Sequence, residues 1–166
     1  DYASRVLAEP DGASDSLHAT EVVGVMAGDG ARSQVCGGSQ FQWRGIATQS
    51  SIVSYNWTNE ISEHNQAINT YNADVSQNSW NYAICYPEWC SWFGYYDAGS
   101  RDYDKIVRGL YGDKITIVGI ASNNGGCTTC QSEIPNFPYG TVAGPIGTYK
   151  NSISVSGTQA DNDAWW

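Results

Sequence analysis

The stretch from residue 41 to residue 121 decides the fold, because the spacing of its apolar residues switches between strand and helix periods. Its first part reads FQWRGIATQSSIVSYNWTNEISEHNQAINTY (residues 41–71). Residues 40–46 alternate between aromatic and polar side chains, which predicts a strand. In residues 57–75 the apolar side chains recur every three or four positions. This spacing predicts an amphipathic helix.

The second part of the stretch repeats these two periods. Residues 80–84 and 91–96 are predicted strands on either side of a short connection that begins and ends with a cysteine. In residues 100–110 the apolar positions i, i+3, i+4 and i+7 predict a second helix with Ser100 as its N-cap. Residues 114–121 carry isoleucine and valine on both faces, which predicts a buried strand.

This order of elements is β-α-β-β-α-β, the split βαβ arrangement. We therefore predict the α+β class and a sandwich in which two helices cover one face of an antiparallel sheet. Extra N-terminal and C-terminal strands are predicted at residues 22–26 and 152–156, the latter with Ile153 and Val155 pointing inward.

The length and charge of the chain limit its class. Its 166 residues are enough for one substantial core, so we predict a flexible arm with a short strand (1–33) and a single disulfide-containing α+β domain (34–166). A net charge of −9 with only eight Lys and Arg residues argues against nucleic acid as a partner. The apolar runs are too short for a transmembrane segment.

No pattern in the sequence predicts a metal or a cofactor. His18 and His64 lack the spacing of a zinc motif, and no nucleotide-binding fingerprint is present. His64 lies in the apolar stripe of the first predicted helix. We predict a histidine at the edge of the core, with one ring nitrogen bonded to a backbone carbonyl.

Cysteine content points to an oxidising compartment. In such a compartment five cysteines would form two disulfides and leave one thiol for another chain or as a free group. Two disulfide arrangements stay open for Cys85 and Cys90: they either close a small loop with each other or each tie the hairpin to another segment. A four-cysteine zinc site is the alternative to disulfides. The candidates are Cys36, Cys85, Cys90, Cys127 and Cys130.

Further features suggest a secreted glycoprotein with an aromatic binding surface. Asn56 begins an Asn-Trp-Thr sequon, which predicts glycosylation. The C-terminal tryptophans are expected either to dock on the domain or to enter a partner. The candidate binding residues are Trp89, Trp92, Tyr95, Tyr96, Trp165 and Trp166.

The side chains that remain as candidates for catalysis are the carboxylates of Asp and Glu. A pair of them would serve as acid and nucleophile in a glycoside hydrolase. The side chains available for such a pair are Glu60, Glu63, Glu88, Asp97, Asp102 and Asp104. An enzyme is the less favoured hypothesis, because positions at helix N-termini explain most of these carboxylates.

Several short motifs occur in the same order as the predicted elements. They are Cys36-Gly-Gly-Ser39, the pair Cys85 and Cys90, Gly126-Cys-Thr-Thr-Cys-Gln-Ser132, and the last strand with Ile153-Ser-Val155. With these motifs the chain resembles small secreted fungal killer toxins of the α/β-sandwich type and related effector proteins. The resemblance implies a non-enzymatic protein that acts outside the producing cell.

The functional hypotheses are therefore ranked. The first is a secreted toxin-like or effector-like protein that binds a cell-surface protein or glycan. The alternatives are a carbohydrate-binding or cell-wall-binding module and a self-assembling extracellular subunit, in which the N-terminal arm or an unpaired cysteine would join copies of the chain. A glycoside hydrolase is the last alternative.

Overall fold

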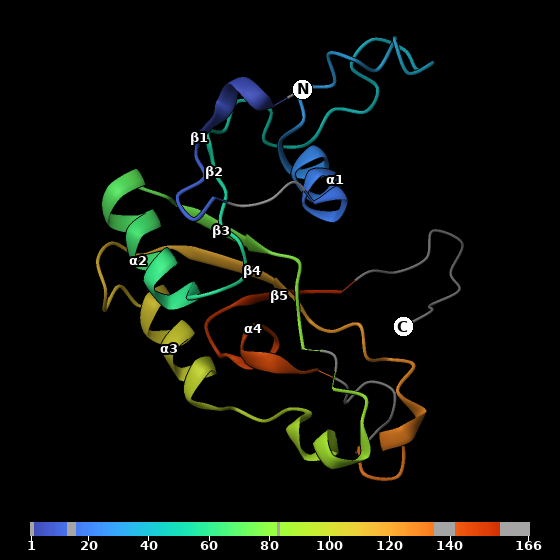
Figure 1. Ribbon diagram of the computed structural model, residues 1–166, viewed down its shortest axis with the longest axis vertical. Helices are drawn as coiled ribbons and strands as arrows, with labels where there is room; N and C mark the ends of the chain where they lie inside the picture. The colour runs from blue at the N-terminus through green and yellow to red at the C-terminus, as the bar shows by residue number, and fades with distance from the viewer. Residues whose placement is uncertain (1, 13–15, 83, 135–141, 157–166) are drawn as a thin grey trace. The chain divides into compact units, whose positions relative to one another are not determined.

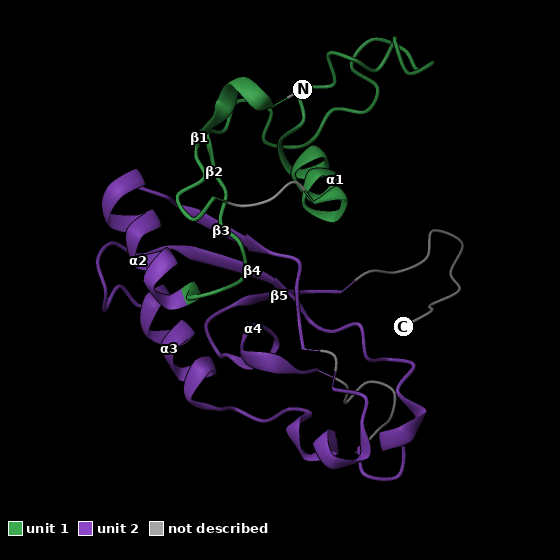
Figure 2. Ribbon diagram, viewed as in Figure 1, with its two compact units in different colours: residues 1–60 green, residues 61–166 purple. Residues whose placement is uncertain are grey.

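The computed structural model describes residues 2–12, 16–82, 84–134 and 142–156. The chain divides into two compact units, residues 1–60 and residues 61–166 (Figure 2). The predicted boundary between residues 33 and 34 falls inside the first unit. Helices and parallel strands occur in both units, so the α+β class is confirmed.

The first unit is a small two-stranded parallel sheet with one long helix. Its elements are η1 (Ala3–Arg5), β1 (Val6–Ala8), α1 (Leu17–Ala27) and β2 (Ile52–Val53), with β1 paired to β2. The hydroxyl of Ser16 caps α1 by accepting a hydrogen bond from the backbone N–H of Ala19. The guanidinium of Arg5 donates to the carbonyls of Ala27 and Ser50, and so connects the end of α1 to the chain before β2.

Two predicted strands of the first unit are wrong. Residues 22–26 belong to α1, because a short apolar run fits a buried helix as well as a strand. Residues 40–43 form turns and residues 44–46 are irregular, and Phe41 has a left-handed backbone with φ of 59°. The backbone N–H groups of residues 45–47 donate to the carbonyls of Gly28 and Met26, so this segment is bonded to the end of α1.

The second unit contains a three-stranded parallel sheet in the order β3-β4-β5 (Figure 1). From the start of α2 the elements are α2 (Glu60–Tyr71), β3 (Val75–Asn78), η2 (Pro87–Trp92), α3 (Ala98–Val107), β4 (Thr116–Ile120), η3 (Thr128–Cys130), α4 (Gly144–Thr148) and β5 (Ile153–Val155). The predicted antiparallel sheet and the β-α-β-β-α-β order are therefore wrong. Each pair of neighbouring strands is joined through a helix, which returns the chain to the same end of the sheet and makes the strands parallel.

The helices were predicted better than the sheet. The predicted helices at 57–75 and 100–110 correspond to α2 and α3, and the predicted strands at 114–121 and 152–156 correspond to β4 and β5. The predicted strands at 80–84 and 91–96 are wrong, since neither forms a strand in the part of them that is described. Among the described residues, no helix is long and apolar enough to cross a membrane.

The core of the second unit lies between β4 and the helices. Ile117 of β4 packs with Tyr103 and Ile106 of α3 and with Ile146 of α4, and all four side chains are buried. A β-carbon at Gly119 would lie 2.2 Å from Cγ2 of Ile146, so α4 approaches the sheet closely only because this residue is glycine.

Strand β5 does not contribute to this core as predicted. Ile153 pairs with Val118 and Val155 pairs with Ile120, so these side chains share the face opposite to Ile117. Ile153 and Val155 are about half exposed, at 53% and 50%. Their predicted inward orientation is wrong, because alternation in an edge strand shows which residues share a face but not which face is covered.

Candidate functional site

Two disulfides hold a compact region of the second unit together. Cys85 is bonded to Cys127 and Cys90 to Cys130, which confirms the predicted pairing of four cysteines and excludes the four-cysteine zinc site. Both bonds join the segment around η2 to the segment around η3, so Cys85 and Cys90 are not bonded to each other in a small loop. The thiol of Cys36 is free and exposed in the first unit.

The 3₁₀-helix η2 begins two residues after Cys85 and contains Cys90, and it carries exposed aromatic side chains. A 3₁₀-helix has three residues per turn, so positions three apart lie on the same edge. Tyr86, Trp89 and Trp92 follow this spacing, and the N–H of Trp89 donates to the carbonyl of Tyr86 at 2.9 Å. After η2 ends, the chain turns at Phe93 and Gly94, where Gly94 has φ of 70°, and the N–H of Tyr95 donates to the carbonyl of Trp92 at 3.1 Å.

We call these four residues, Tyr86, Trp89, Trp92 and Tyr95, the aromatic ladder. Ring centroids of Tyr86 and Trp89 are 5.3 Å apart, and those of Trp92 and Tyr95 are 6.3 Å apart. Trp89, Trp92 and Tyr95 expose 43%, 45% and 57% of their surface. Exposed aromatic rings that are supported by their neighbours are suited to binding, because little side-chain freedom is lost when a partner arrives.

The other edges of η2 explain why the ladder faces solvent. Cys90 is buried, and Phe93 packs against the cluster that the disulfides form with Ile134. Glu88 and Ser91, which occupy the third edge, are exposed and polar. Because the edge with Cys90 and Phe93 packs in the disulfide cluster, η2 cannot rotate, and the edge with the aromatic residues stays exposed.

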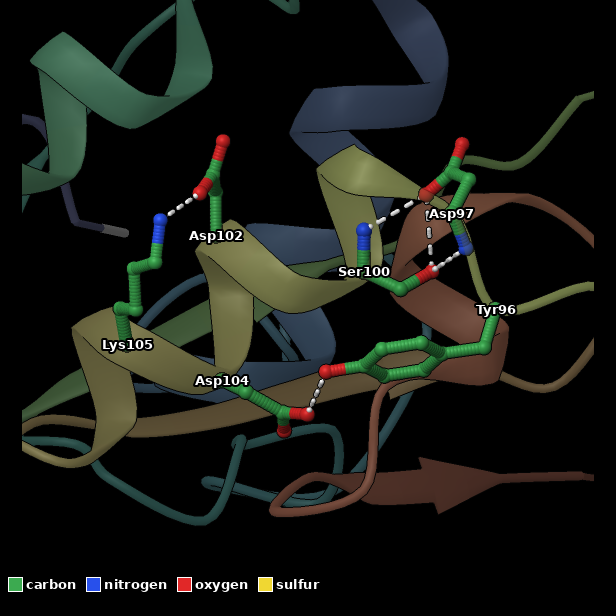
Figure 3. Close-up of polar contacts among 6 residues, drawn as sticks. All are labelled: Tyr96, Asp97, Ser100, Asp102, Asp104 and Lys105. Atoms are coloured by element: carbon green, nitrogen blue, oxygen red, sulfur yellow. Dashed lines mark hydrogen bonds and ion pairs between the residues drawn. The ribbon is translucent and has the colours of Figure 1, made fainter.

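Behind the ladder, Tyr96 is fastened to the carboxylate of Asp104 (Figure 3). The hydroxyl of Tyr96 donates to Oδ2 of Asp104 at 2.7 Å. Oδ1 of the same carboxylate accepts the backbone N–H of Lys150 and both the backbone N–H and the side-chain amide of Asn151, each at 2.9 Å. Asp104 therefore joins α3 to the end of the ladder and to the chain before β5, and we call this group of contacts the Asp104 clamp.

The charge of the clamp is reflected in the pKa of its members. Burial alone would raise the pKa of Asp104, but the hydrogen bonds from Tyr96, Asn151 and Lys150 hold this pKa below its ordinary value. The hydrogen bond to Asp104 also raises the pKa of Tyr96. Nζ of Lys150 lies 4.6 Å from the centroid of the Tyr96 ring, so the cation covers a face of that ring.

The remaining carboxylates of α3 have structural contacts. Asp97, not Ser100, is the N-cap, and it accepts the backbone N–H of Ser100 in a capping box. Asp102 pairs with Lys105 on the helix surface, away from the contact between Tyr96 and Asp104 (Figure 3). These contacts supply structural reasons for the carboxylates that were candidates for acid and base.

His64 lies in the core beside polar strand residues. Its ring packs edge-on against Tyr103, with centroids 5.4 Å apart, which agrees with the predicted position at the core. Nε2 lies 2.9 Å from the hydroxyl of Ser76, and this hydroxyl also accepts a hydrogen bond from the amide of Asn78 at 2.9 Å. Nε2 thus has a side-chain hydroxyl as a partner, whereas the prediction named a backbone carbonyl for one ring nitrogen.

The other predicted residues are not part of the ladder. Trp165 and Trp166 lie outside the described residues. Asn56 lies in the first unit, where its backbone N–H donates to Asp11 and its side-chain oxygen accepts the N–H of Thr58. Glu60 and Glu63 lie in the first turn of α2.

Sequence reasoning missed Tyr86 and the role of Asp104. The signal for Tyr86 was present, because aromatic residues occur at every third position from 86 to 95. Such a three-residue period is typical of a 3₁₀-helix, not of the alternating strand that was predicted. The clamp had no local signal, since Asp104 and Asn151 are 47 residues apart.

No group of histidine, cysteine and carboxylate side chains that could hold a metal occurs within the described part of the chain. Comparison of the chain with family models, with curated proteins and with solved structures finds no match in any of the three.

Proposed function

We propose that this chain is a secreted, non-enzymatic binding protein that recognises a partner on or outside a target cell, as a toxin or effector would. The single observation that carries the proposal is the aromatic ladder, a group of four exposed rings on and directly beside a disulfide-bonded 3₁₀-helix. Exposed tryptophan and tyrosine are costly to leave in water, and they are the residues that dominate binding surfaces.

Support for an extracellular location comes from the same region. One disulfide is formed just before η2, at Cys85, and the other within it, at Cys90, and structural disulfides persist in oxidising compartments. They join segments 42 and 40 residues apart, so they fix the ladder to distant parts of the second unit. After export, a protein no longer meets cellular reductants, so its disulfides persist. It does meet proteases, and disulfides support its fold against them.

Binding is favoured over catalysis by the chemistry of the site. Glu88, the carboxylate on η2, lies beside the exposed rings. Asp97 caps a helix and Asp104 accepts four hydrogen bonds. A glycoside hydrolase needs two carboxylates that reach one bond of the substrate. The contacts of Asp97 and Asp104 supply a structural purpose for both.

The experiment is a cell-binding assay with matched variants. Fluorescently labelled protein is added to panels of bacterial, fungal and plant cells, and the bound fraction is measured by flow cytometry or pelleting. The variant Trp89→Ala with Trp92→Ala removes two ladder rings. The control, Trp43→Ala with Trp57→Ala, removes two exposed tryptophans of the first unit.

We expect the ladder variant to lose at least tenfold in affinity for the cells that the wild type binds, and the control to bind normally. Circular dichroism of both variants checks that they are folded. Binding that is unchanged in the folded ladder variant, or no binding to any cell, would refute the proposed function.

A further inference from the structure

The chemistry around the ladder specifies what kind of partner it fits. Residues 85–96 and 127–133, which the two disulfides join, contain no leucine, isoleucine, valine or methionine. Protein partners are usually held by aromatic anchors mixed with methionine and arginine. Here the apolar surface consists of flat rings.

The polar groups beside the rings are hydroxyls, amides and carboxylates. Glu88 and Ser91 are exposed on η2. The segment from η3 onward, bonded to η2 through Cys90 and Cys130, exposes further polar side chains. They are Thr128, Thr129, Gln131, Ser132 and Glu133. Such groups donate to and accept from hydroxyl groups, which cover the edges of a sugar ring.

Charge excludes an anionic polymer. Residues 84–100 contain Glu88 and Asp97 but no lysine or arginine, and the chain as a whole has a net charge of −9. Lys150 lies over the ring of Tyr96, which is not one of the four ladder residues. A sulfated or uronic acid polymer would meet repulsion without a compensating cation.

The arrangement of the rings suits a ligand with more than one sugar unit. Tyr86 and Trp89 lie edge to face, with centroids 5.3 Å apart and planes at 79°. Trp92 and Tyr95 are tilted by 53°, with centroids 6.3 Å apart. The ladder therefore consists of two pairs of exposed rings, and each pair offers an aromatic surface to the apolar face of a sugar.

We propose that the aromatic ladder binds an uncharged polysaccharide, with sugar units packed against the exposed rings of its two aromatic pairs, Tyr86 with Trp89 and Trp92 with Tyr95. This inference rests on the proposed function and names its partner. The apolar C–H faces of the sugars contact the rings, and the hydroxyl groups at their edges bond to the polar side chains of η2 and η3. No bond of the ligand is broken.

The test uses cello-, xylo-, manno- and chito-oligosaccharides of two to six units, titrated into the full chain by calorimetry. In at least one series we expect the association constant to rise at least tenfold from two to four units and to change less than threefold beyond four. Trp92→Ala should lower the affinity for the tetramer at least tenfold, Trp92→Phe should retain most of it, and Trp57→Ala should leave it unchanged.

A second measurement separates this inference from the proposed function. Cells that bind the protein through the ladder are treated either with protease or with polysaccharide-degrading enzymes. Loss of binding after polysaccharide digestion alone supports the inference. Loss after protease alone leaves the proposed function standing and refutes the inference, as does stronger competition by a sulfated polymer than by a neutral one. Failure of the cell-binding assay itself refutes both.

Discussion

Replacing Asp104 by alanine tests whether one carboxylate holds the region behind the ladder together. Its two oxygens accept four hydrogen bonds, from the hydroxyl of Tyr96, the backbone of Lys150 and the backbone and side chain of Asn151. The residue is 7% exposed, so the substitution removes a nearly buried charge together with all four bonds.

The size of the effect follows from the surroundings of the donors. A hydrogen bond to a charged group contributes about 1.5–3 kcal/mol, so four independent bonds would contribute about 6–12 kcal/mol. They are not independent, and Lys150 and Asn151 are exposed residues whose donors can bond to water after the substitution. Removing the buried charge also removes the cost of its desolvation, which offsets a further part of the lost stabilisation. We therefore expect Asp104→Ala to lower the free energy of unfolding by about 3 kcal/mol.

The assay is urea unfolding followed by circular dichroism, with Asp102→Ala as the control on the same helix. Asp102 pairs with Lys105 at the surface, so its replacement should cost less than about 1 kcal/mol. Asp104→Asn keeps an acceptor but loses the charge and should fall between the two. A cost below about 1 kcal/mol for Asp104→Ala would refute the reasoning, because the clamp would then not stabilise the fold.

Further predictions concern acid, the sheet and the thiols. The pKa of Asp104 is held below its ordinary value in the folded protein. The stabilisation by the Asp104 carboxylate is therefore fully present above the ordinary pKa and is lost as pH falls through the lowered pKa. The difference in unfolding free energy between wild type and Asp104→Asn should be constant above about pH 5 and shrink below about pH 4. Urea unfolding at a series of pH values checks this, and a difference that grows in acid would contradict it. Ile117→Ala should cost about 2–5 kcal/mol and Ile153→Ala distinctly less, since the first side chain is buried and the second is half exposed; equal costs in urea unfolding would show that both faces of the sheet are equally covered. Iodoacetamide should add one label to the native, unreduced protein, at Cys36, as measured by mass spectrometry; labelling of Cys85, Cys90, Cys127 or Cys130 would contradict the disulfide pairing.

The sequence predicted elements with a strong local period. The stripe in residues 57–75 and the repeat in residues 100–110 correspond to α2 and α3, because a helix face that packs on a core needs apolar residues at that spacing. Strand β4 was predicted from isoleucines, two of which, Ile115 and Ile117, are buried near or in it. Two cysteine pairs were expected, and two are present.

What the sequence did not predict depends on contacts between distant residues. The direction of the strands is set by which helix joins them, and α4 contains Gly144 and Pro145, which gave no helical signal. The aromatic-rich residues 91–96 were read as a strand, but residues 91–92 end η2, in which Cys90 is buried and disulfide-bonded, and the chain then turns at Phe93 and Gly94. The Asp104 clamp spans 47 residues, which no local pattern reports.

The most direct test of the central claim is to observe the tryptophans while a partner binds. The chain has seven tryptophans, and each gives an indole N–H signal in a nitrogen-15 correlation spectrum, assigned by single Trp→Phe variants. A bound glycan or cell-wall extract should shift the signals of Trp89 and Trp92 and leave those of Trp43 and Trp57 in place. Shifts confined to Trp43 and Trp57 would contradict the account, because the binding surface would then lie away from the aromatic ladder.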